Sequence, residues 1–479
     1  MAGKNQRLEL TWYNKDKALI PTENGKYGYT WVDPRDPRYC ETHTLTITDS
    51  VVGTQAPKEE GVTYSERADL EPQDDNLLIL GESGDVLEAL TRVPELRDKY
   101  LGKVKCVYID PPFNTAQTFA NYEDNLEHSV WLTMMRDRLL HLRDLLSEDG
   151  SIWVHLDDVE NHRMRLLLDE VFGSNNFVAE MQWEKTYSPR NDSTSIPAVT
   201  DSIVVYRKSE SFTINKLSRT AAMDTIYKNP DADPKGPWTS DNPCANHGDG
   251  SGGMCYAIQS PLTGEMLRPP SGSSWRYSQS RVLRSLQEWA PYKLENLDDF
   301  EWRAQNEGIP LEKVNRDVCA LVLVDPIAVA KQKAETRQKQ GNWPELFLTG
   351  SGRFRRKSWL ANMPGRMPVN LLPYIEVGHS DGAKKEIKAL FPGETPFSTP
   401  KPERLIERII HIATNPGDIV LDVFAGSGTT AAVAQKMGRR WVTCELVEDT
   451  FNRFTRPRLE KVVNGEDMGG ISTTKGERV

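Results

Sequence analysis

A short stretch at residues 108–115, YIDPPFNT, holds the densest chemistry in the sequence. Asp110 follows the apolar run VKCVYI, so we expect it at the carboxyl end of a buried strand, where open α/β sheets bind ligands. The prolines fix φ, lack amide donors and hold Asp110 extended. The Asp110 carboxylate and the Pro111 carbonyl could therefore accept hydrogen bonds from an exocyclic amino group, with Phe113 stacked on the base. A strand-terminating turn with an exposed Asp110 is the alternative.

A second stretch, DIVLDVFAGSGTTAAVAQKMGRRWVTCEL, has the pattern of a strand, a glycine-rich turn, a helix and another strand. Gly426 and Gly428 allow the backbone to approach a ligand closely. The helix begins at Thr429 or Thr430, and its first turn offers free amide protons and the positive end of a dipole. Glu445, at the end of the second strand, is placed to accept hydrogen bonds from both hydroxyls of a ribose. The unit predicts a ligand that contains adenosine.

The residues missing from this loop narrow the choice of ligand. The sequence GSGTT lacks the Lys that a phosphate-binding GxxxxGK[ST] loop needs, and Ala431 stands where a dinucleotide fingerprint has its third Gly. Nucleoside triphosphates and NAD are therefore disfavoured, and S-adenosylmethionine remains, with Asp422 near its amino-acid end. For methyl transfer to an aryl amine, acceptors at Asp110 would orient the amino nitrogen toward the sulfonium methyl in line. No covalent enzyme intermediate is required.

Strands alternate with amphipathic helices around both motifs. Apolar residues at three- and four-residue steps predict a helix after the first motif, closed by Gly150, and SIWVHLDD then alternates as a strand. Asp157 and Glu160 resemble a capping box for the following helix. KPERLIERIIHIAT predicts another helix, with Pro402 in its first turn. We therefore expect an α/β fold with a doubly wound, mainly parallel sheet.

The middle of the chain, from about residue 185 to 375, lacks this alternation of strands and helices. Gly, Pro, Ser and isolated Trp dominate it. Residues 205–375 contain 23 Lys and Arg against 18 Asp and Glu, whereas the whole chain has a net charge of −10. A basic middle segment in an otherwise acidic chain indicates that this segment binds an anionic partner. The alternative is a charged loop that is simply exposed to solvent. The sharpest cluster, GRFRRKSW, provides candidate DNA-phosphate contacts at Arg353, Arg355, Arg356 and Lys357.

Together the two motifs resemble the amino-methyltransferases of DNA, which combine an Asp/Asn/Ser-Pro-Pro-aromatic tetrapeptide with an Asp-x-Phe-x-Gly-x-Gly cofactor loop. The matching residues are Asp110, Pro111, Pro112 and Phe113 in the tetrapeptide and Asp422, Phe424, Gly426 and Gly428 in the loop. The catalytic motif comes first, which resembles the permuted β-class of this family. LELTWYNK, DEVFGSNNF and VGHSDGAKKEIKALF are similar to modification subunits of type III restriction systems.

This resemblance implies a Rossmann-like methyltransferase sheet with an inserted target-recognition domain and S-adenosylmethionine as cofactor. NLLILGESGDVLEAL looks like the loop near the cofactor adenine, which gives Gly81 and Glu82. FSTPKPERLIERII resembles the Lys-Pro motif that covers the cofactor, which gives Lys401. The expected domains are an N-terminal arm (1–75), a catalytic half (76–200), a target-recognition domain (201–375), a cofactor half (376–460) and a flexible tail (461–479).

Asp at the first motif position implies N6 methylation of a flipped adenine in duplex DNA, in a restriction-modification or phage-defence system. N4-cytosine methylation of DNA stays open, as does a role mainly as the DNA-recognition subunit of a larger restriction complex. Methylation of RNA or of a protein amide is a further alternative, but those relatives usually carry Asn first and lack a large basic insert. The implied partners are double-stranded DNA, a second copy of the chain in a homodimer, and a helicase-nuclease restriction subunit.

The composition is that of an ordinary soluble protein, with 38% apolar and 27% charged residues. The sequence has no apolar run of about 18 residues and no signal-peptide pattern. We therefore expect a cytoplasmic protein of a prokaryote or phage, without membrane contact. Six cysteines are too scattered for a disulfide framework. Cys244, His247 and Cys255 are the best metal candidates but lack a fourth ligand, so no metal is expected.

Overall fold

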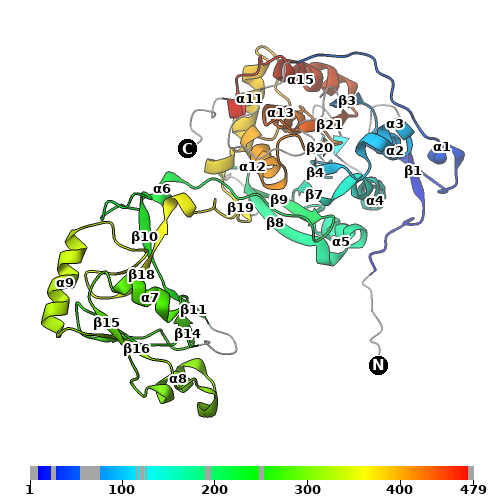
Figure 1. The fold of residues 1–479 in the computed structure, drawn as a ribbon. Helices are drawn as coiled ribbons and strands as arrows, with labels where there is room; N and C mark the ends of the chain where they lie inside the picture. The colour runs from blue at the N-terminus through cyan, green and yellow to red at the C-terminus, as the bar shows by residue number, and fades with distance from the viewer. Residues whose placement is uncertain are drawn as a thin grey trace, which may run out of the picture. The chain divides into compact units, whose positions relative to one another are not determined.

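The computed structural model describes residues 9–22, 28–53, 76–114, 117–118, 123–124, 127–188, 196–246 and 253–472. The chain divides into two compact units (Figure 1). The first contains residues up to 217 and again from 367, and the second contains residues 218–366. The second unit is narrower than the target-recognition domain expected at 201–375, because residues 200–207 and 371–372 form strands of the first unit's sheet.

An eight-stranded sheet organises the first unit. Its strands in spatial order are β19 (Leu371–Leu372), β8 (Phe177–Glu184), β9 (Thr200–Arg207), β7 (Leu146–Leu156), β4 (Val104–Ile109), β20 (Ile419–Asp422), β21 (Arg440–Glu445) and β3 (Leu77–Leu80). Neighbouring strands are parallel, except that β9 is antiparallel to both β7 and β8. The predicted mainly parallel sheet is therefore confirmed.

The centre of this sheet is a topological switch point. Strand β4 continues through α4 (His128–Leu145) to β7 on one side, whereas its neighbour β20 continues through α13 (Thr429–Lys436) to β21 on the other. Adjacent parallel strands whose connections leave in opposite directions open a crevice at their carboxyl ends, where α/β proteins bind ligands. The fold thereby brings together Asp110, just after β4, and Asp422, the last residue of β20.

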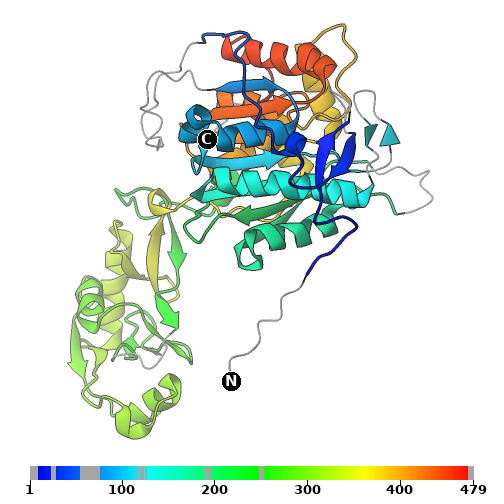
Figure 2. The ribbon, with the colours of Figure 1, turned by 90° about the vertical axis from the view of Figure 1, so that its right-hand side faces the viewer.

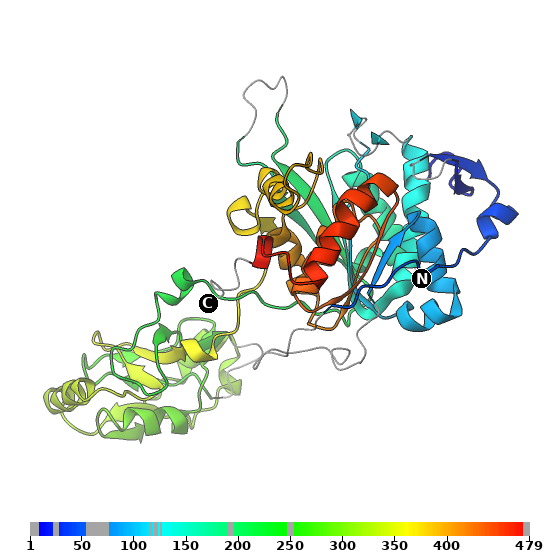
Figure 3. The same ribbon diagram turned by 90° about the horizontal axis from the view of Figure 1, so that it is seen from above.

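Two hydrophobic cores cover the two faces of the sheet. Helices α2 (Ser83–Arg92), α4 and α5 (Asn161–Phe172) bury their apolar stripes in one core (Figure 2). Helices α12 (Glu403–Ala413), α13 and α15 (Arg456–Val463) pack in the other (Figure 3). Fully buried Trp131 on α4 and Ile409 on α12 illustrate the two layers. The doubly wound architecture expected from the sequence is confirmed.

Two local predictions are wrong. Helix α4 does not extend to Gly150, because Leu146 already pairs with β4 and starts β7. The capping box at α5 does not form either: the Asp157 carboxylate accepts from the Val159 amide at 2.9 Å, and Glu160 makes no side-chain cap hydrogen bond. The Glu160 side chain is fully buried and contacts other residues instead.

The described parts of both termini pack on the first unit. A hairpin of β1 (Ala18–Pro21) and β2 (Tyr29–Val32) is followed by α1 (Pro37–Cys40), and the Trp12 indole donates to Thr133 at 2.7 Å. At the other end, Ile471 is buried and its amide donates to the Glu403 carboxylate at 3.0 Å. The predicted flexible tail (461–479) is thus in contact with the first unit near residue 471, its flexibility stays a prediction, and residues 473–479 lie outside the described residues. Short helices complete this unit: α3 (Pro94–Tyr100), α10 (Tyr374–Val377), α11 (Ser380–Leu390) and α14 (Glu448–Thr450).

The second unit has a core of its own, into which Trp238, Trp275, Trp289 and Trp359 are buried. Its sheets contain β10 (Trp238–Asp241), β18 (Phe354–Trp359) and β17 (Leu346–Leu348); β13 (Met266–Leu267), β12 (Ile258–Gln259), β16 (Ala320–Leu323) and β15 (Tyr292–Glu295); and β11 (Cys244–Asn246) with β14 (Ser273–Trp275). Its helices are α6 (Ala221–Asp224), α7 (Gln279–Leu286), α8 (Phe300–Glu307) and α9 (Ile327–Lys339).

Neither a membrane span nor a metal cluster is found in the part of the chain that the structure describes. None of its helices is both long and apolar enough to cross a bilayer. None of its His, Cys, Asp and Glu side chains gather in a group of three or more that could hold a metal ion. His247, one of the three candidate ligands, lies outside the described residues.

Candidate active site

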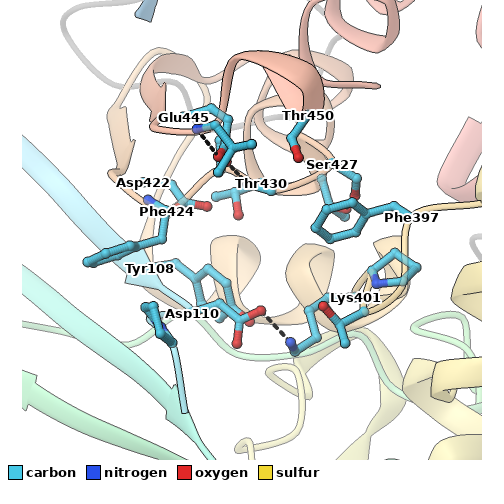
Figure 4. A pocket seen from close by; sticks show the side chains of 17 residues that line it. Tyr108, Asp110, Phe397, Lys401, Asp422, Phe424, Ser427, Thr430, Glu445 and Thr450 are labelled. Atoms are coloured by element: carbon cyan, nitrogen blue, oxygen red, sulfur yellow. Dashed lines mark hydrogen bonds and ion pairs between the residues drawn. The ribbon is translucent and has the colours of Figure 1, made fainter. Parts of the chain in front are cut away.

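A pocket lies at the switch point of the sheet (Figure 4). Four segments line it: the acceptor loop (residues 110–114) with Tyr108 before it, the strap (residues 397–401), the glycine loop (residues 423–428) between Asp422 and the first turn of α13, and residues 445–450. The predicted site residues that line it are Asp110, Pro112, Lys401, Asp422, Phe424, Gly426, Thr429, Thr430 and Glu445. Those that do not line it are Gly81, Glu82, Pro111, Phe113 and Gly428.

Asp110 faces this pocket with its two oxygens in different situations. Oδ2 forms an ion pair with Lys401 Nζ. Oδ1 is buried and has no hydrogen-bond partner in the described structure. A buried acceptor without a donor carries an uncompensated desolvation cost of about 1–3 kcal/mol, so it marks a place where a ligand can donate. The alternative of an exposed, strand-terminating turn is therefore wrong, because the Asp110 side chain is only 21% exposed.

Side chains from neighbouring elements hold the acceptor loop. The Trp131 indole on α4 donates to the Pro112 carbonyl at 2.8 Å. Asn114 adopts a positive φ of 64°, which Asn tolerates better than most residues, and its amide donates to Glu160 Oε1 at 2.7 Å. Glu160 also accepts from Arg163 at 3.1 Å. The loop is thus tied to α4 and α5, a role of Trp131 and Glu160 that the sequence did not reveal.

A buried polar chain supports the aromatic residue of the acceptor loop. The Phe113 ring stacks on His155 with centroids 5.9 Å apart and an interplanar angle of 24°. His155 Nδ1 lies 2.9 Å from the Tyr108 hydroxyl, and Nε2 lies 3.3 Å from Asp201 Oδ2. Lys185 completes the chain by donating to Asp201 Oδ1 at 2.7 Å.

The protonation of this chain follows from its surroundings. Burial lowers the pKa of His155, and the Lys401 charge lowers it further, so the ring is neutral at pH 7. Burial alone would raise the pKa of Asp201, but hydrogen bonds from His155 and Lys185 and the charge of Lys185 lower it below its usual value. An ionised Asp201 keeps the imidazole proton on Nε2, so Nδ1 accepts the proton of the Tyr108 hydroxyl. Tyr108, a pocket residue that sequence reasoning missed, lies two residues before Asp110 on the same face of the strand.

Two buried carboxyl groups face the pocket from the opposite motif. Asp422 Oδ1 accepts from the Phe424 amide at 2.9 Å. Glu445 accepts from the Gly426 and Val447 amides, each at 2.8 Å. Burial raises the pKa of Asp422 to about 7 and that of Glu445 to about 7. Both groups are therefore poised to ionise when a ligand brings donors or positive charge.

The glycine loop has the backbone that its sequence predicts. Gly426 and Gly428 have φ values of 51° and 77°, in the left-handed region that favours glycine. A Cβ on Gly426 would lie 3.3 Å from the Phe397 ring of the strap. The pocket edge at Gly426 thus has no room for a side chain, and α13 begins directly afterwards at Thr429, as expected.

A buried arginine underlies the glycine loop and was not found from the sequence. Arg458 Nη1 donates to Thr429 Oγ1 at 2.8 Å, and Nη2 donates to Glu403 Oε1 at 2.9 Å. Glu403 begins α12, two residues after Lys401 ends the strap. Arg458 therefore links the two segments that face each other across the pocket. No local pattern distinguishes it from the other basic residues of its helix.

Gly81 and Glu82, predicted to lie near the cofactor adenine, make several contacts within the protein. The Glu82 carboxylate caps α2 by accepting from the Gly84 amide at 2.6 Å, and it pairs with the buried Arg138 guanidinium. The Tyr29 hydroxyl donates to it at 3.1 Å. Gly81 donates its amide to the Glu445 carbonyl at 3.0 Å, beside the pocket but not in its lining. Glu82 therefore accepts from several protein donors, and the cofactor contacts of Gly81 and Glu82 stay a prediction.

One of the four expected DNA contacts is wrong. The Lys357 side chain is 0% exposed and pairs with Asp231 at 2.6 Å and Asp233 at 2.5 Å, so it cannot reach a phosphate. Arg356 is partly exposed and pairs with Asp241. Arg353 is exposed and Arg355 is half-buried. The four cations share strand β18 or its start, and a strand turns successive side chains to different faces.

Residues 104–455 match the sequence pattern of the N6/N4 DNA methylases. The chain belongs to the N6/N4 DNA methylase family. This matched range contains the acceptor loop, the strap, the glycine loop and residues 445–450, and therefore every segment that lines the pocket.

Several curated proteins are similar to this DNA methylase over most of its length. The StyLTI Mod subunit of a type III restriction-modification enzyme from Salmonella typhimurium is 26% identical over 438 residues, covering 81% of this chain and 57% of the relative. The EcoP15I Mod subunit from Escherichia coli is 26% identical over 427 residues, covering 79% of this chain and 59% of the relative. The chain thus spans little more than half the length of these relatives.

Solved structures also align with this DNA methylase. PvuII DNA methyltransferase, described as cytosine-N4-specific, aligns with a TM-score of 0.38 and 15% identity, covering 82% of this chain and 94% of that one. The M1.HpyAVI complex with SAM aligns with a TM-score of 0.34 and 13% identity, covering 80% of this chain and 99% of that one.

Proposed function

We propose that this DNA methylase transfers a methyl group from S-adenosylmethionine to the N6 amino group of an adenine flipped out of a specific duplex DNA sequence. The observation that carries the proposal is the buried, unpartnered Asp110 Oδ1, which shares a pocket with Asp422 and Glu445. A buried acceptor needs a donor, and the exocyclic amino group of a base is one. Membership of the N6/N4 DNA methylase family supports a DNA base as the substrate.

The glycine-loop side of the pocket fits S-adenosylmethionine. Asp422 would pair with the ammonium of the amino-acid arm, and Glu445 would accept from the ribose hydroxyls with the lone pairs that its amide partners leave free. Gly426 allows close approach, and the first amides of α13 at Thr429 and Thr430 add donors. The raised pKa values of Asp422 and Glu445 support this assignment, because a donor-rich ligand favours the ionised carboxylates. When bound, the cofactor supplies an electrophilic methyl group on its sulfonium.

The acceptor loop would hold the target base. Asp110 and the Pro111 carbonyl accept from the amino group, and Phe113, backed by His155, stacks on the ring. The amino nitrogen gains the methyl group and loses one proton, for which Asp110 Oδ1 is a buried acceptor. Because the loop is already fixed by Trp131 and Glu160, its acceptors need no reorganisation during the reaction.

Adenine is proposed over cytosine because Asp, and not Ser, stands first in the tetrapeptide. We further propose that the second unit is the target-recognition domain, with Arg353, Arg355 and Arg356 as phosphate contacts. The similarity to Mod subunits of type III restriction-modification enzymes supports a helicase-nuclease restriction subunit as a partner. A homodimer and a location in the cytoplasm of a prokaryotic host complete the proposal.

The test is to incubate the purified chain with methyl-labelled cofactor and DNA from a host without adenine methylation. The DNA is then digested to nucleosides, and the modified sites are mapped by sequencing. We expect label in N6-methyladenine at one sequence motif, and no label with the Asp110→Ala variant. Label in N4-methylcytosine would replace the adenine assignment by the cytosine alternative. Label only in RNA or protein would contradict the function.

A further inference from the structure

Lys401 lies over the face of Phe113 on which the target base is proposed to stack. Its ammonium pairs with Asp110 Oδ2, and it lies 5.2 Å from the centroid of the Phe113 ring (Figure 4 shows the pairing with Asp110). It is therefore a cationic donor placed over an aromatic face and directed at the acceptor loop. An adenine stacked on this face of Phe113, with its amino group at the free Asp110 Oδ1, would need the space over the ring. The Lys401 ammonium and the base cannot both occupy this position.

The backbone around Lys401 restricts how it can make room. Pro400 and Pro402 flank it, so φ is fixed on both sides and the residue before each proline is held extended. Glu403 then anchors the start of α12 through Arg458. Hence the flexible part of this segment is the Lys401 side chain itself, which has four rotatable bonds and is 10% exposed.

The pocket offers this ammonium an alternative partner only through a ligand. Asp422 also faces the pocket, but its carboxyl pKa is raised to about 7, and it is assigned to the cofactor ammonium. The amino-acid arm of S-adenosylmethionine carries its own carboxylate next to that ammonium. A cation that lines the same pocket, freed from Asp110, would compensate the buried charge of that carboxylate.

We propose that Lys401 is a positioning residue that exchanges between two carboxylates, that of Asp110 and that of the cofactor's amino-acid arm. Pairing with the cofactor moves the Lys401 ammonium away from Asp110 and clears the Phe113 face for the target base. The inference rests on the proposed function and extends it, because it couples the two ligands: each favours the Lys401 position that the other needs. By linkage, cofactor and extrahelical base must then strengthen each other's binding by the same factor.

The first test needs no DNA. Calorimetry compares S-adenosylhomocysteine, which keeps the amino-acid arm but lacks the sulfonium charge, with 5′-methylthioadenosine, which lacks the arm. If Asp110 competes for Lys401, Asp110→Asn should tighten S-adenosylhomocysteine binding about three- to tenfold, because a larger fraction of the chain is competent to bind the arm. Binding of 5′-methylthioadenosine should not change. In a Lys401→Met background, Asp110→Asn should no longer affect either ligand.

The outcomes separate this inference from the proposed function. Three outcomes overturn the exchange while the proposed function stands. Asp110→Asn does not tighten S-adenosylhomocysteine binding, or it changes the binding of both nucleosides equally, or its effect is retained in the Lys401→Met background. Failure of the wild-type chain to bind S-adenosylhomocysteine overturns both. Thermal melting of each variant confirms that it is folded, and Asp110→Asn against wild type tests the exchange even if Lys401→Met fails to fold.

A second test follows base flipping. The mapped target adenine is replaced by 2-aminopurine, whose fluorescence rises when it leaves the stack. In the wild type, we expect S-adenosylhomocysteine to raise this signal severalfold by clearing the Phe113 face. In Lys401→Met the signal should be high with or without the nucleoside. Lys384→Met, which removes an exposed lysine of α11 outside the pocket lining, is the matched control and should behave as wild type. A cofactor-dependent signal that persists in Lys401→Met overturns the inference.

Discussion

The two sides of the pocket are built in different ways. The glycine loop owes its shape mainly to its own βαβ unit, with positive φ at Gly426 and Gly428 and the Gly426 amide donating to the Glu445 carboxylate. The acceptor loop is held from outside, by Trp131 on α4, Glu160 before α5 and His155 on β7. One side is therefore specified locally and the other by tertiary contacts. A single substitution should disable the first, whereas the second should lose activity in smaller steps.

The largest effect is expected from Gly426→Asp on the local side. A side chain there would meet the Phe397 ring at 3.3 Å in a backbone conformation of positive φ, and it would add a charge at the edge of the pocket. We expect cofactor affinity to fall at least about 100-fold, about 3 kcal/mol, measured by calorimetry. Gly102→Asp, at a φ of 67° with open space around it, is the matched control and should bind normally. Unchanged affinity in Gly426→Asp would remove this loop from the cofactor site.

The externally held side should respond more mildly to the loss of one support. Asp201→Asn removes the charge that fixes the His155 tautomer, so the stack under Phe113 and the Tyr108 hydroxyl lose their defined arrangement. We expect kcat to fall about tenfold with cofactor affinity within about twofold. Asp169→Asn likewise removes the charge of an acceptor, here that of the Tyr206 hydroxyl away from the pocket, and should keep wild-type kcat. Equal losses in both variants would make Asp201 a stability residue only.

The pH dependence of cofactor binding should arise from the carboxyl groups on the glycine-loop side of the pocket. The pKa values of Asp422 and Glu445 are raised to about 7, and the ligand binds their ionised forms. Binding therefore releases protons, so affinity should rise with pH up to about 7 and level off above it. We expect binding about 100-fold weaker at pH 6 than at pH 8, because each of the two carboxyl groups contributes about tenfold, and a change of about tenfold in Glu445→Gln. An affinity that falls with rising pH would contradict the assignment of these carboxylates.

The smallest effect is expected in the second unit. Arg353→Ala combined with Arg355→Ala should weaken DNA binding about three- to tenfold for target and non-target duplexes alike, and should reduce the salt slope by about two. Arg35→Ala, at a guanidinium that is 91% exposed in the first unit, is the control for a general loss of positive charge. An equal loss in that control would indicate non-specific attraction, and loss for the target duplex alone would indicate base contacts.

The same contrast explains what could be predicted from the sequence. One βαβ unit of about 30 residues contains the first strand, the glycines, the start of the helix and the acidic residue that ends the second strand. The positions of Gly426, Thr429 and Glu445 therefore followed from the local sequence pattern. Asp110 was also placed correctly, because a buried strand that ends in two prolines presents its last residue at the ligand-binding edge. These features need only short-range rules.

The residues that sequence reasoning missed or misread depend on partners distant in the chain. Glu160 looks like part of a capping box, yet it is buried beneath the acceptor loop and bonded to Asn114. Arg458 and Lys357 resemble ordinary surface cations, but each is buried against carboxylates from other segments. Charge and spacing along the chain do not tell which cations the fold encloses. Only the tertiary structure assigns their roles.

The most direct test of the account separates the two sides of the pocket at Asp110. Asp110→Ala removes the acceptor but leaves Asp422, Glu445 and the glycine loop intact. N6-methyladenine is measured in DNA after reaction, and S-adenosylhomocysteine binding is measured by calorimetry on the same preparation. We predict that methylation falls at least about 1,000-fold and that nucleoside affinity is retained or increased. Substantial N6-methyladenine formation by Asp110→Ala, with binding intact, would contradict the central claim that Asp110 holds the target amine.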